Sequence, residues 1–226
     1  MLTLKKIISG CNSEQRRFGL SSMILYSLPV AAVAIICIFY VDRPLSLFVQ
    51  SHLYGNKVWS DITSTIPDAL LATVIIISTL SCTAYLSRKY KHVYDTRTFL
   101  LKVVAISLPV SYVVKTALKV VFGRIETRIW LQNSQQYGFH WFHGGFRFDG
   151  FPSGHMVVFA TLFSAIWRIY PKYKIALVLL LAVLGVLLLA TNYHFLSDVI
   201  CGTYLGLLVE SIMQRYCSAE RNSPLH

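Results

Sequence analysis

The sequence is poor in charged residues, and most of its charge has one sign. Only 14% of the 226 residues are charged, against about 25% in a typical soluble domain, whereas 55% are hydrophobic. Acidic residues number 10 and basic residues 21, which gives a formal net charge of +11. Because the Lys and Arg residues lie mainly in short segments between apolar runs, we interpret them as orientation signals that contact anionic lipid, not nucleic acid. The composition excludes an ordinary soluble globule and predicts an integral membrane protein.

Cysteine is also scarce, and the features of a cleavable signal peptide are missing. The five cysteines have no metal-ligand spacing, and three lie within apolar runs, which predicts small core residues without a disulfide framework. The first apolar run begins near Ser22 and continues to about Val41. We therefore expect this run to be retained as a first membrane span.

Six apolar runs are candidate membrane spans. They cover about Ser22–Val41, Ala69–Ser87, Phe99–Phe122, Met156–Tyr170, Ile175–Thr191 and Phe195–Met213. A spanning helix needs about 20 apolar residues, and the fourth run reaches that length if its helix starts at Pro152 or Ser153, where Pro suits a first turn and Ser a cap. The sequence predicts an all-α, polytopic membrane helical bundle with six transmembrane helices, in which residues 1–226 form a single membrane-embedded domain.

Basic residues predict the orientation of this bundle. With six spans, four clusters fall on one side: Lys5, Lys6, Arg16 and Arg17; Arg88, Lys89, Lys91 and Arg97; Arg168, Lys172 and Lys174; Arg215 and Arg221. Because positively charged loops stay in the cytoplasm, both termini are expected to be cytoplasmic. The opposite side then carries the segments Asp42–Asp68 and Gly123–Gly150 and a short turn at 192–194.

Polar residues gather at the ends of the spans on that opposite side. Lys119 closes the third span, Arg124 and Arg128 follow it, Ser153 and His155 open the fourth, His194 and Asp198 open the sixth, and the long loop holds His140, His143, Arg147 and Asp149. Each ionisable group inside a bilayer costs about 2.5–3.5 kcal/mol on insertion scales. A cluster of cations and imidazoles at one depth therefore predicts an anionic ligand.

The histidines have the spacing of a nucleophile and an acid. His194 and Asp198 are four residues apart and share one face of a helix. An Asp that accepts a proton from one ring nitrogen leaves the other nitrogen free to attack. His155 is then a candidate general acid for the leaving oxygen.

The remaining polar residues suit a phosphate. Ser153 and the amide of Gly154 stand at a helix start, where hydrogen-bond donors point at an anion. Lys119 and Arg124 add positive charge. Phosphoryl transfer needs little beyond such positioning and charge.

Three motifs carry a resemblance to a known family. Pro152-Ser153-Gly154-His155 is intact, His194 and Asp198 are kept in NYHFLSDVICG, and Lys119 lies in LKVVFGRIETR. In order and spacing these motifs resemble the type 2 phosphatidic acid phosphatase family, membrane lipid phosphatases related to vanadium haloperoxidases, with the core at about residues 115–213.

The resemblance implies roles for the motif residues. His194 would form a phosphohistidine, Asp198 would orient it, and His155 would be the general acid. Lys119, Ser153 and Gly154 would hold the phosphate, without a metal or another cofactor. The chain departs from the family at two arginines, since Glu126 and Leu188 occupy their places. Candidates to replace them as phosphate ligands are Arg124 and Arg128, with Arg147 as a further one.

The predicted function is that of an integral membrane lipid phosphatase. It would remove a phosphate monoester or diphosphate from a lipid (polyprenyl diphosphate, lipid A, phosphatidylglycerophosphate or phosphatidic acid) at the periplasmic face of a bacterial inner membrane. Its partners would be that lipid and the bilayer, with no nucleic acid, and the oligomeric state is left open. The alternatives are a lipid phosphotransferase that uses the same histidine, a catalytically impaired lipid-binding protein, and a metal-dependent hydrolase whose ligands are His140, His143, His155, His194 and Asp198.

Overall fold

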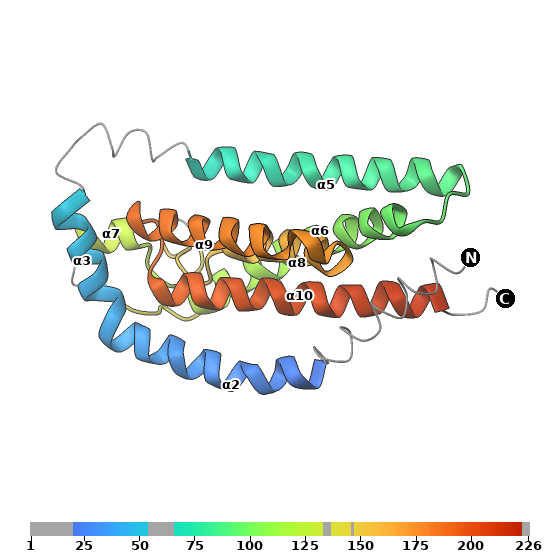
Figure 1. Cartoon of the computed structure of the whole chain (residues 1–226). Coiled ribbons are helices and arrows are strands. Elements are labelled where there is room, and N and C mark those ends of the chain that lie inside the picture. The colour runs from blue at the N-terminus through green and yellow to red at the C-terminus, as the bar shows by residue number, and fades with distance from the viewer. Residues whose placement is uncertain (1–19, 54–65, 133–136, 146, 223–226) are drawn as a thin grey trace.

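A computed structural model describes residues 20–53, 66–132, 137–145 and 147–222, and every regular element in these ranges is a helix (Figure 1). The helices are α2 (Leu20–Ile36), η1 (Cys37–Val41), α3 (Asp42–Leu53), α5 (Ile66–Tyr90), α6 (Thr96–Phe122), α7 (Thr127–Gln132), α8 (Gly154–Ile169), η3 (Pro171–Tyr173), α9 (Lys174–Ala190) and α10 (Leu196–Asn222). The all-α prediction is confirmed for the described residues.

Within the described part of the chain, four helical segments are long and apolar enough to cross a membrane: Leu25–Leu53, Thr96–Phe122, Pro171–Ala190 and Leu196–Glu220. They overlap the first, third, fifth and sixth predicted spans. The fourth predicted span is α8, an apolar helix of 16 residues that begins at Gly154 with Ser153 as its N-cap. The second lies in α5, which is 25 residues long. The count of six spans, the cytoplasmic termini and the single-domain boundary stay predictions.

The chain stays helical beyond the outer end of the first predicted span. From Asp42 the sequence predicts an interfacial helix or a loop, and the structure has the helix α3 as far as Leu53. The bend comes from η1, a π-helical turn in which the N–H of Asp42 donates to the carbonyl of Cys37. Such a turn changes the direction of a helix without breaking its backbone hydrogen bonds, so α3 turns back across the ends of the other helices (Figure 1).

Close packing of α8 on α10 forms the centre of the bundle. A side chain at Gly206 would place its Cβ 2.3 Å from the carbonyl oxygen of Val157, and one at Gly202 would come within 2.6 Å of the carbonyl oxygen of Ser153. Small residues at such contacts let helix backbones approach closely in membranes. These two glycines therefore hold the start of α8 beside the start of α10.

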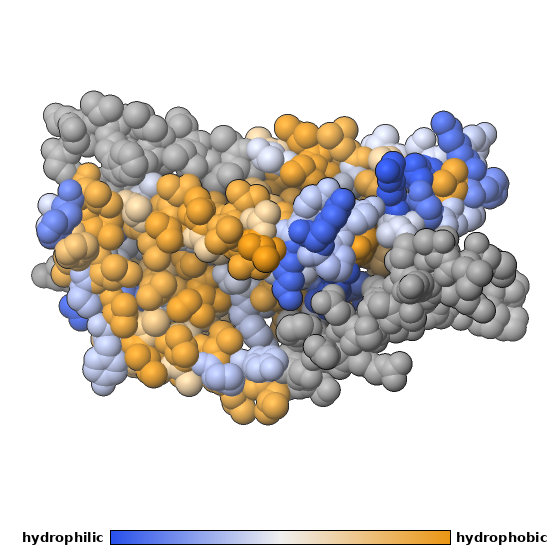
Figure 2. All heavy atoms as spheres, viewed as in Figure 1, coloured by the Kyte–Doolittle hydropathy of each residue, from blue (hydrophilic) through white to orange (hydrophobic). Residues whose placement is uncertain are grey.

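The surface separates an apolar flank from a polar end. Figure 2 shows hydrophobic side chains over the middle of the molecule and hydrophilic ones gathered toward the end where α5 meets α6 and α10 finishes. Large exposed apolar side chains include Ile175, Leu179, Val183 and Val186 of α9 and Leu28 of α2. A contiguous apolar flank of this kind suits contact with lipid tails.

Candidate active site

The end of α6 and the start of α8 are joined by a loop that folds back on itself. Gly123 ends α6 in the left-handed conformation (φ 51°), and a Cβ there would lie 1.9 Å from the carbonyl oxygen of His140, so only glycine fits. Further along, the N–H of Gly150 donates to the carbonyl of Arg124 at 2.8 Å. These contacts return the segment Gly150–His155 to the end of α6, although Gly150 lies 26 positions after Arg124 in the sequence.

The start of α8 carries an unsatisfied hydroxyl. Ser153 is fully buried, its backbone N–H donates to the carbonyl of Asp198 at 3.1 Å, and its side chain makes no cap hydrogen bond. Among the described residues its Oγ has no hydrogen-bond partner. Since buried hydroxyls are normally paired, this donor at a helix N-terminus is suited to an anion.

Lys115 of α6 also reaches the start of α8. Its Nζ lies 3.0 Å from the position that a Cβ on Gly154 would occupy, so the glycine keeps room for the lysine. Sequence reasoning selected Lys119 and passed over Lys115. The four-residue spacing, which places both lysines on one face of α6, is the signal that could have identified it.

The imidazole of His194 is held by the backbone of the loop. Its Nδ1 is 3.0 Å from the carbonyl oxygen of Gly150 and 3.7 Å from Oδ2 of Asp198. Only Nδ1–H can donate to a carbonyl, so this geometry assigns the proton to Nδ1 and leaves the lone pair on Nε2 for attack. Oδ2 of Asp198 accepts the N–H of Phe195 at 2.9 Å instead. That Asp198 orients the ring of His194 therefore stays a prediction.

His155 lies across from His194. The ring centroids are 6.2 Å apart at an angle of 63°, close enough for both rings to contact one phosphate group. The ring of Tyr193 lies 5.8 Å from His155 and 5.5 Å from His194. The structure thus brings the predicted nucleophile, the predicted acid and the start of α8 together.

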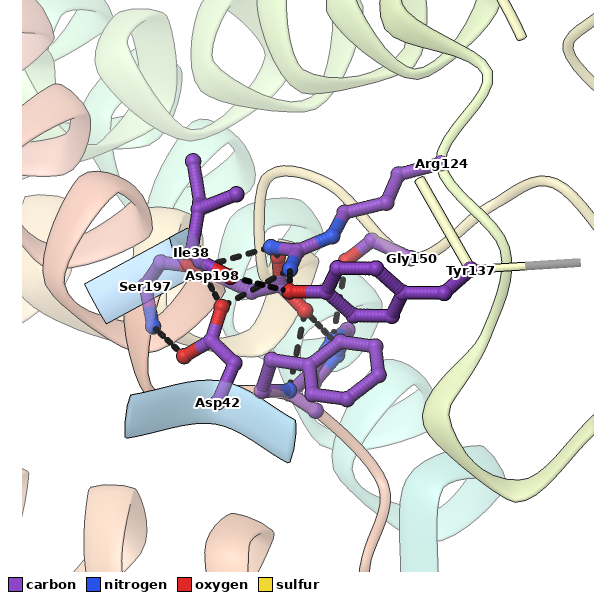
Figure 3. A network of polar contacts seen from close by, with 9 residues as sticks. Ile38, Asp42, Arg124, Tyr137, Gly150, Ser197 and Asp198 are labelled. Carbon is purple, nitrogen blue, oxygen red and sulfur yellow. Dashed lines mark hydrogen bonds and ion pairs between the residues drawn. The ribbon is translucent and has the colours of Figure 1, made fainter. Parts of the chain in front are cut away.

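A buried network of charges connects Asp42, Arg124 and Asp198 (Figure 3). The guanidinium of Arg124 donates from Nη1 to Oδ1 of Asp198 at 2.5 Å and to Oγ of Ser197 at 2.6 Å. Its Nη2 donates to Oδ2 of Asp42 at 2.7 Å and to the hydroxyl of Tyr137 at 3.1 Å. Arg124, Asp42 and Asp198 are fully buried. Sequence reasoning missed Asp42, and the available signal was a carboxylate directly after an apolar run.

The charges of this network support one another. Burial opposes the charge of the guanidinium, but the carboxylates of Asp198 and Asp42 raise the pKa of Arg124 above its ordinary value. Burial raises the pKa of Tyr137. Its phenol therefore stays protonated and donates to the carbonyl of Ile38 at 2.6 Å. Both terminal nitrogens of Arg124 are thus engaged inside the protein, and its predicted phosphate contact stays a prediction.

Arg128 approaches the turn before His194 from α7. Its Nε and Nη2 donate to the carbonyl of Thr191 at 3.1 and 3.0 Å, and its Cζ is 5.0 Å from the centroid of the Tyr193 ring. Leu188, which takes the place of a motif arginine, is buried in α9. Arg128 therefore supplies a cation near this turn from another part of the chain.

The two histidines of the long loop have partners other than His155 and His194. Nδ1 of His143 is 3.0 Å from the carbonyl oxygen of Trp141 on the exposed part of the loop, and the ring of His140 packs on Phe148 with centroids 4.8 Å apart. Among the described residues, no three His, Cys, Asp or Glu side chains converge as metal ligands.

Comparison with known proteins assigns the family. The sequence model of the PAP2 superfamily matches residues 100–221, more than half of the chain. The chain belongs to this superfamily, which confirms the resemblance drawn from the motifs. Asp42 lies outside the matched residues.

Two curated relatives are similar over a short region. They are lipid A 1-phosphatases from Rhizobium etli and Rhizobium johnstonii, each 34% identical over 65 residues. The alignment covers 29% of this chain and 28% and 27% of those relatives. No solved structure gives a significant match.

Proposed function

We propose that the protein is a membrane lipid phosphatase that works through a phosphohistidine on His194. The observation that carries this proposal is the unpartnered, buried hydroxyl of Ser153 at the start of α8, beside Lys115 and the facing histidines. Family membership and the four apolar helices support a lipid substrate reached from the bilayer. We further propose that the site opens at the periplasmic face of a bacterial inner membrane.

The phosphate would be held by donors from two helices. The hydroxyl of Ser153 and the amide of Gly154 point to a phosphate oxygen at the helix N-terminus. Lys115 and Lys119 bring positive charge from α6, which offsets the charge that grows on the phosphoryl oxygens. Arg128, held at the turn before His194, would supply the positive charge of the motif arginine whose place Leu188 occupies.

The reaction would have two steps. In the first, Nε2 of His194 attacks phosphorus, the bond between phosphorus and the lipid oxygen breaks, and the leaving oxygen takes a proton from His155. In the second, water attacks phosphorus and gives a proton to His155, and the bond between phosphorus and Nε2 of His194 breaks with its electron pair returning to Nε2. Inorganic phosphate leaves, and both histidines are regenerated. The hydrogen bond from Nδ1 of His194 to Gly150 keeps Nε2 available in both steps.

A phosphate monoester on a glycolipid is the substrate to test first. The support is the name of the two relatives, lipid A 1-phosphatase. Phosphatidic acid, phosphatidylglycerophosphate and a polyprenyl diphosphate carry the same chemical group on an apolar anchor, and they complete the panel.

The experiment measures phosphate release from these four lipids in detergent, with and without a chelator. The wild type is compared with His194→Ala and with His143→Ala, a matched control on the exposed loop. We expect release from at least one lipid, retained by His143→Ala and under chelation, and lost by about 10³-fold or more in His194→Ala.

Other outcomes select the alternatives. A doubly phosphorylated lipid product would indicate transfer to a second lipid, and loss of activity on chelation would indicate a metal-dependent hydrolase. Release from no lipid by a folded protein would refute the phosphatase and favour a lipid-binding role.

A further inference from the structure

We infer that Asp42 is a positioning residue that sets the charge beside the nucleophile. This inference rests on the proposed function. Asp42 lies in the first apolar helical segment and outside residues 100–221, which match the family. It acts through Arg124 and Ser197.

Asp42 completes the hydrogen bonding of the network. Its Oδ1 accepts the backbone N–H of Ser197 at 3.0 Å, and its Oδ2 accepts Nη2 of Arg124 at 2.7 Å and the hydroxyl of Ser197 at 2.5 Å. The oxygens of Asp198 accept Nη1 of Arg124 and the N–H of Phe195. All four carboxylate oxygens are thus satisfied, which lets two buried anions share one cation at fixed geometry.

The count of charges gives Asp42 its effect on the nucleophile. Two carboxylates and one guanidinium leave a net charge of −1, and the nearest member, Asp198, is 3.7 Å from Nδ1 of His194. When Nε2 bonds to phosphorus while Nδ1 keeps its proton, the ring gains positive charge. Without the charge of Asp42, Arg124 would neutralise Asp198 completely, and that developing charge would lose its counter-charge.

The fold holds Asp42 at this position. The hydroxyl of Tyr137 ties the π-helical turn to the long loop through the carbonyl of Ile38 at 2.6 Å. Further along α3, Nδ2 of Asn192 donates to Oε1 of Gln50 at 3.2 Å, so α3 is also fixed to the turn before His194. The bend between α2 and α3 therefore places a carboxylate against the first turn of α10.

The charged and titratable groups around His194 come from several elements. Asp198 belongs to α10, Asp42 to α3, Arg124 to the loop after α6, Arg128 to α7, Tyr193 to the turn before His194, and His155 to α8. Of these, Asp42 is the one whose charge can be removed isosterically without touching a group that contacts His194.

The experiment uses the full chain and the lipid that the wild type hydrolyses. It compares Asp42→Asn, the double variant Asp42→Asn/Arg124→Gln, and the control Ser51→Ala on the exposed face of α3. We expect Asp42→Asn to lower kcat on the order of tenfold with little change in KM, because the loss acts on the transition state. Since imidazolium loses its counter-charge, the acidic limb of kcat/KM should move to lower pH.

The double variant separates charge from structure. It restores a net charge of −1, carried by Asp198 alone, and should recover most of kcat and the wild-type acidic limb. Thermal unfolding in detergent identifies variants that fail to fold, and if Asp42→Asn alone fails, the folded double variant carries the test.

Distinct results would overturn distinct claims. Wild-type kinetics in folded Asp42→Asn, or a double variant as impaired as the single one, would overturn the role of Asp42 and leave the proposed function intact. Absence of phosphate release from the wild type would overturn the proposed function and this inference together.

Discussion

Two arginines in the interior of the bundle, Arg124 and Arg168, are built into very different surroundings. Arg124 is fully buried between the carboxylates of Asp42 and Asp198. Arg168 of α8, with 14% of its side chain exposed, donates from Nε and Nη2 to Oε2 of Glu210 at 3.0 and 2.7 Å. Glu210 lies 12 residues beyond Asp198 in α10, ~18 Å along a helix with a rise of 1.5 Å per residue.

The two arginine sites differ in their net charge and in the hydrogen bonds of their carboxylates. Around Arg124 each carboxylate oxygen accepts a hydrogen bond, and the net charge is negative beside His194. Around Arg168 the charges cancel, and Oε1 of Glu210 has no hydrogen-bond partner among the described residues. Among the same residues, Nε of Arg124 also has no hydrogen-bond partner, so the two regions differ in net charge and in the pairing of their carboxylate oxygens. A neutral pair joins two helices, whereas a triad with excess negative charge sets the electrostatics of the neighbouring His194.

The largest effect is expected from Arg124→Met. Removing the guanidinium leaves two buried carboxylates side by side, and breaking a buried pair in this way costs about 3–5 kcal/mol. Chemical or thermal unfolding in detergent should show this loss, and phosphate release should vanish. A variant as stable as the wild type would show that the network does not support the fold.

A smaller effect is expected from Arg168→Met. Only one carboxylate, Glu210, loses its partner, and it can take up a proton, so the cost should be about 1–3 kcal/mol. The same unfolding assay measures this loss. The folded variant should keep the kcat of the wild type, and a large fall in kcat would contradict the separation of the two regions.

The smallest effect is expected from Asp95→Ala, at the turn between α5 and α6, where Asp95 caps the start of α6. Asp95 accepts the backbone N–H and the hydroxyl of Thr98 and pairs with Arg88, and these contacts lower the pKa of Asp95 to about 2. Because this pKa is lowered on folding, the stabilisation is fully present above the ordinary value of 3.8 and is lost as pH falls toward about 2.

The test at this turn is a difference between variants. The unfolding midpoint of Asp95→Ala should lie below that of the wild type at pH 7 and coincide with it near pH 2. Asp149→Ala in the long loop is a matched control for the loss of one acidic side chain. A gap between wild type and Asp95→Ala that stays constant from pH 7 to pH 2 would contradict the capping role.

Much of the site follows from local sequence. Pro152-Ser153-Gly154-His155 marks a helix start with donors. The expectation that His194 and Asp198 share one helix face is wrong, because α10 begins at Leu196 and His194 lies in the turn before it. The four-residue spacing places Lys115 on the same face of α6 as Lys119 and so marks it as a candidate, but only the packing of α8 shows that Lys115 lies at Gly154.

The sequence by itself determined the helical class, the long apolar runs and the motifs that mark the family, because hydrophobic length and helical spacing are local properties of the chain. Only the tertiary structure decided the partners of the buried charges. Asp42 and Asp198 are 156 positions apart, and nothing in either segment specifies that they share Arg124. That meeting depends on the bend at η1 and on the return of the long loop to Gly150, which are set by packing between distant elements.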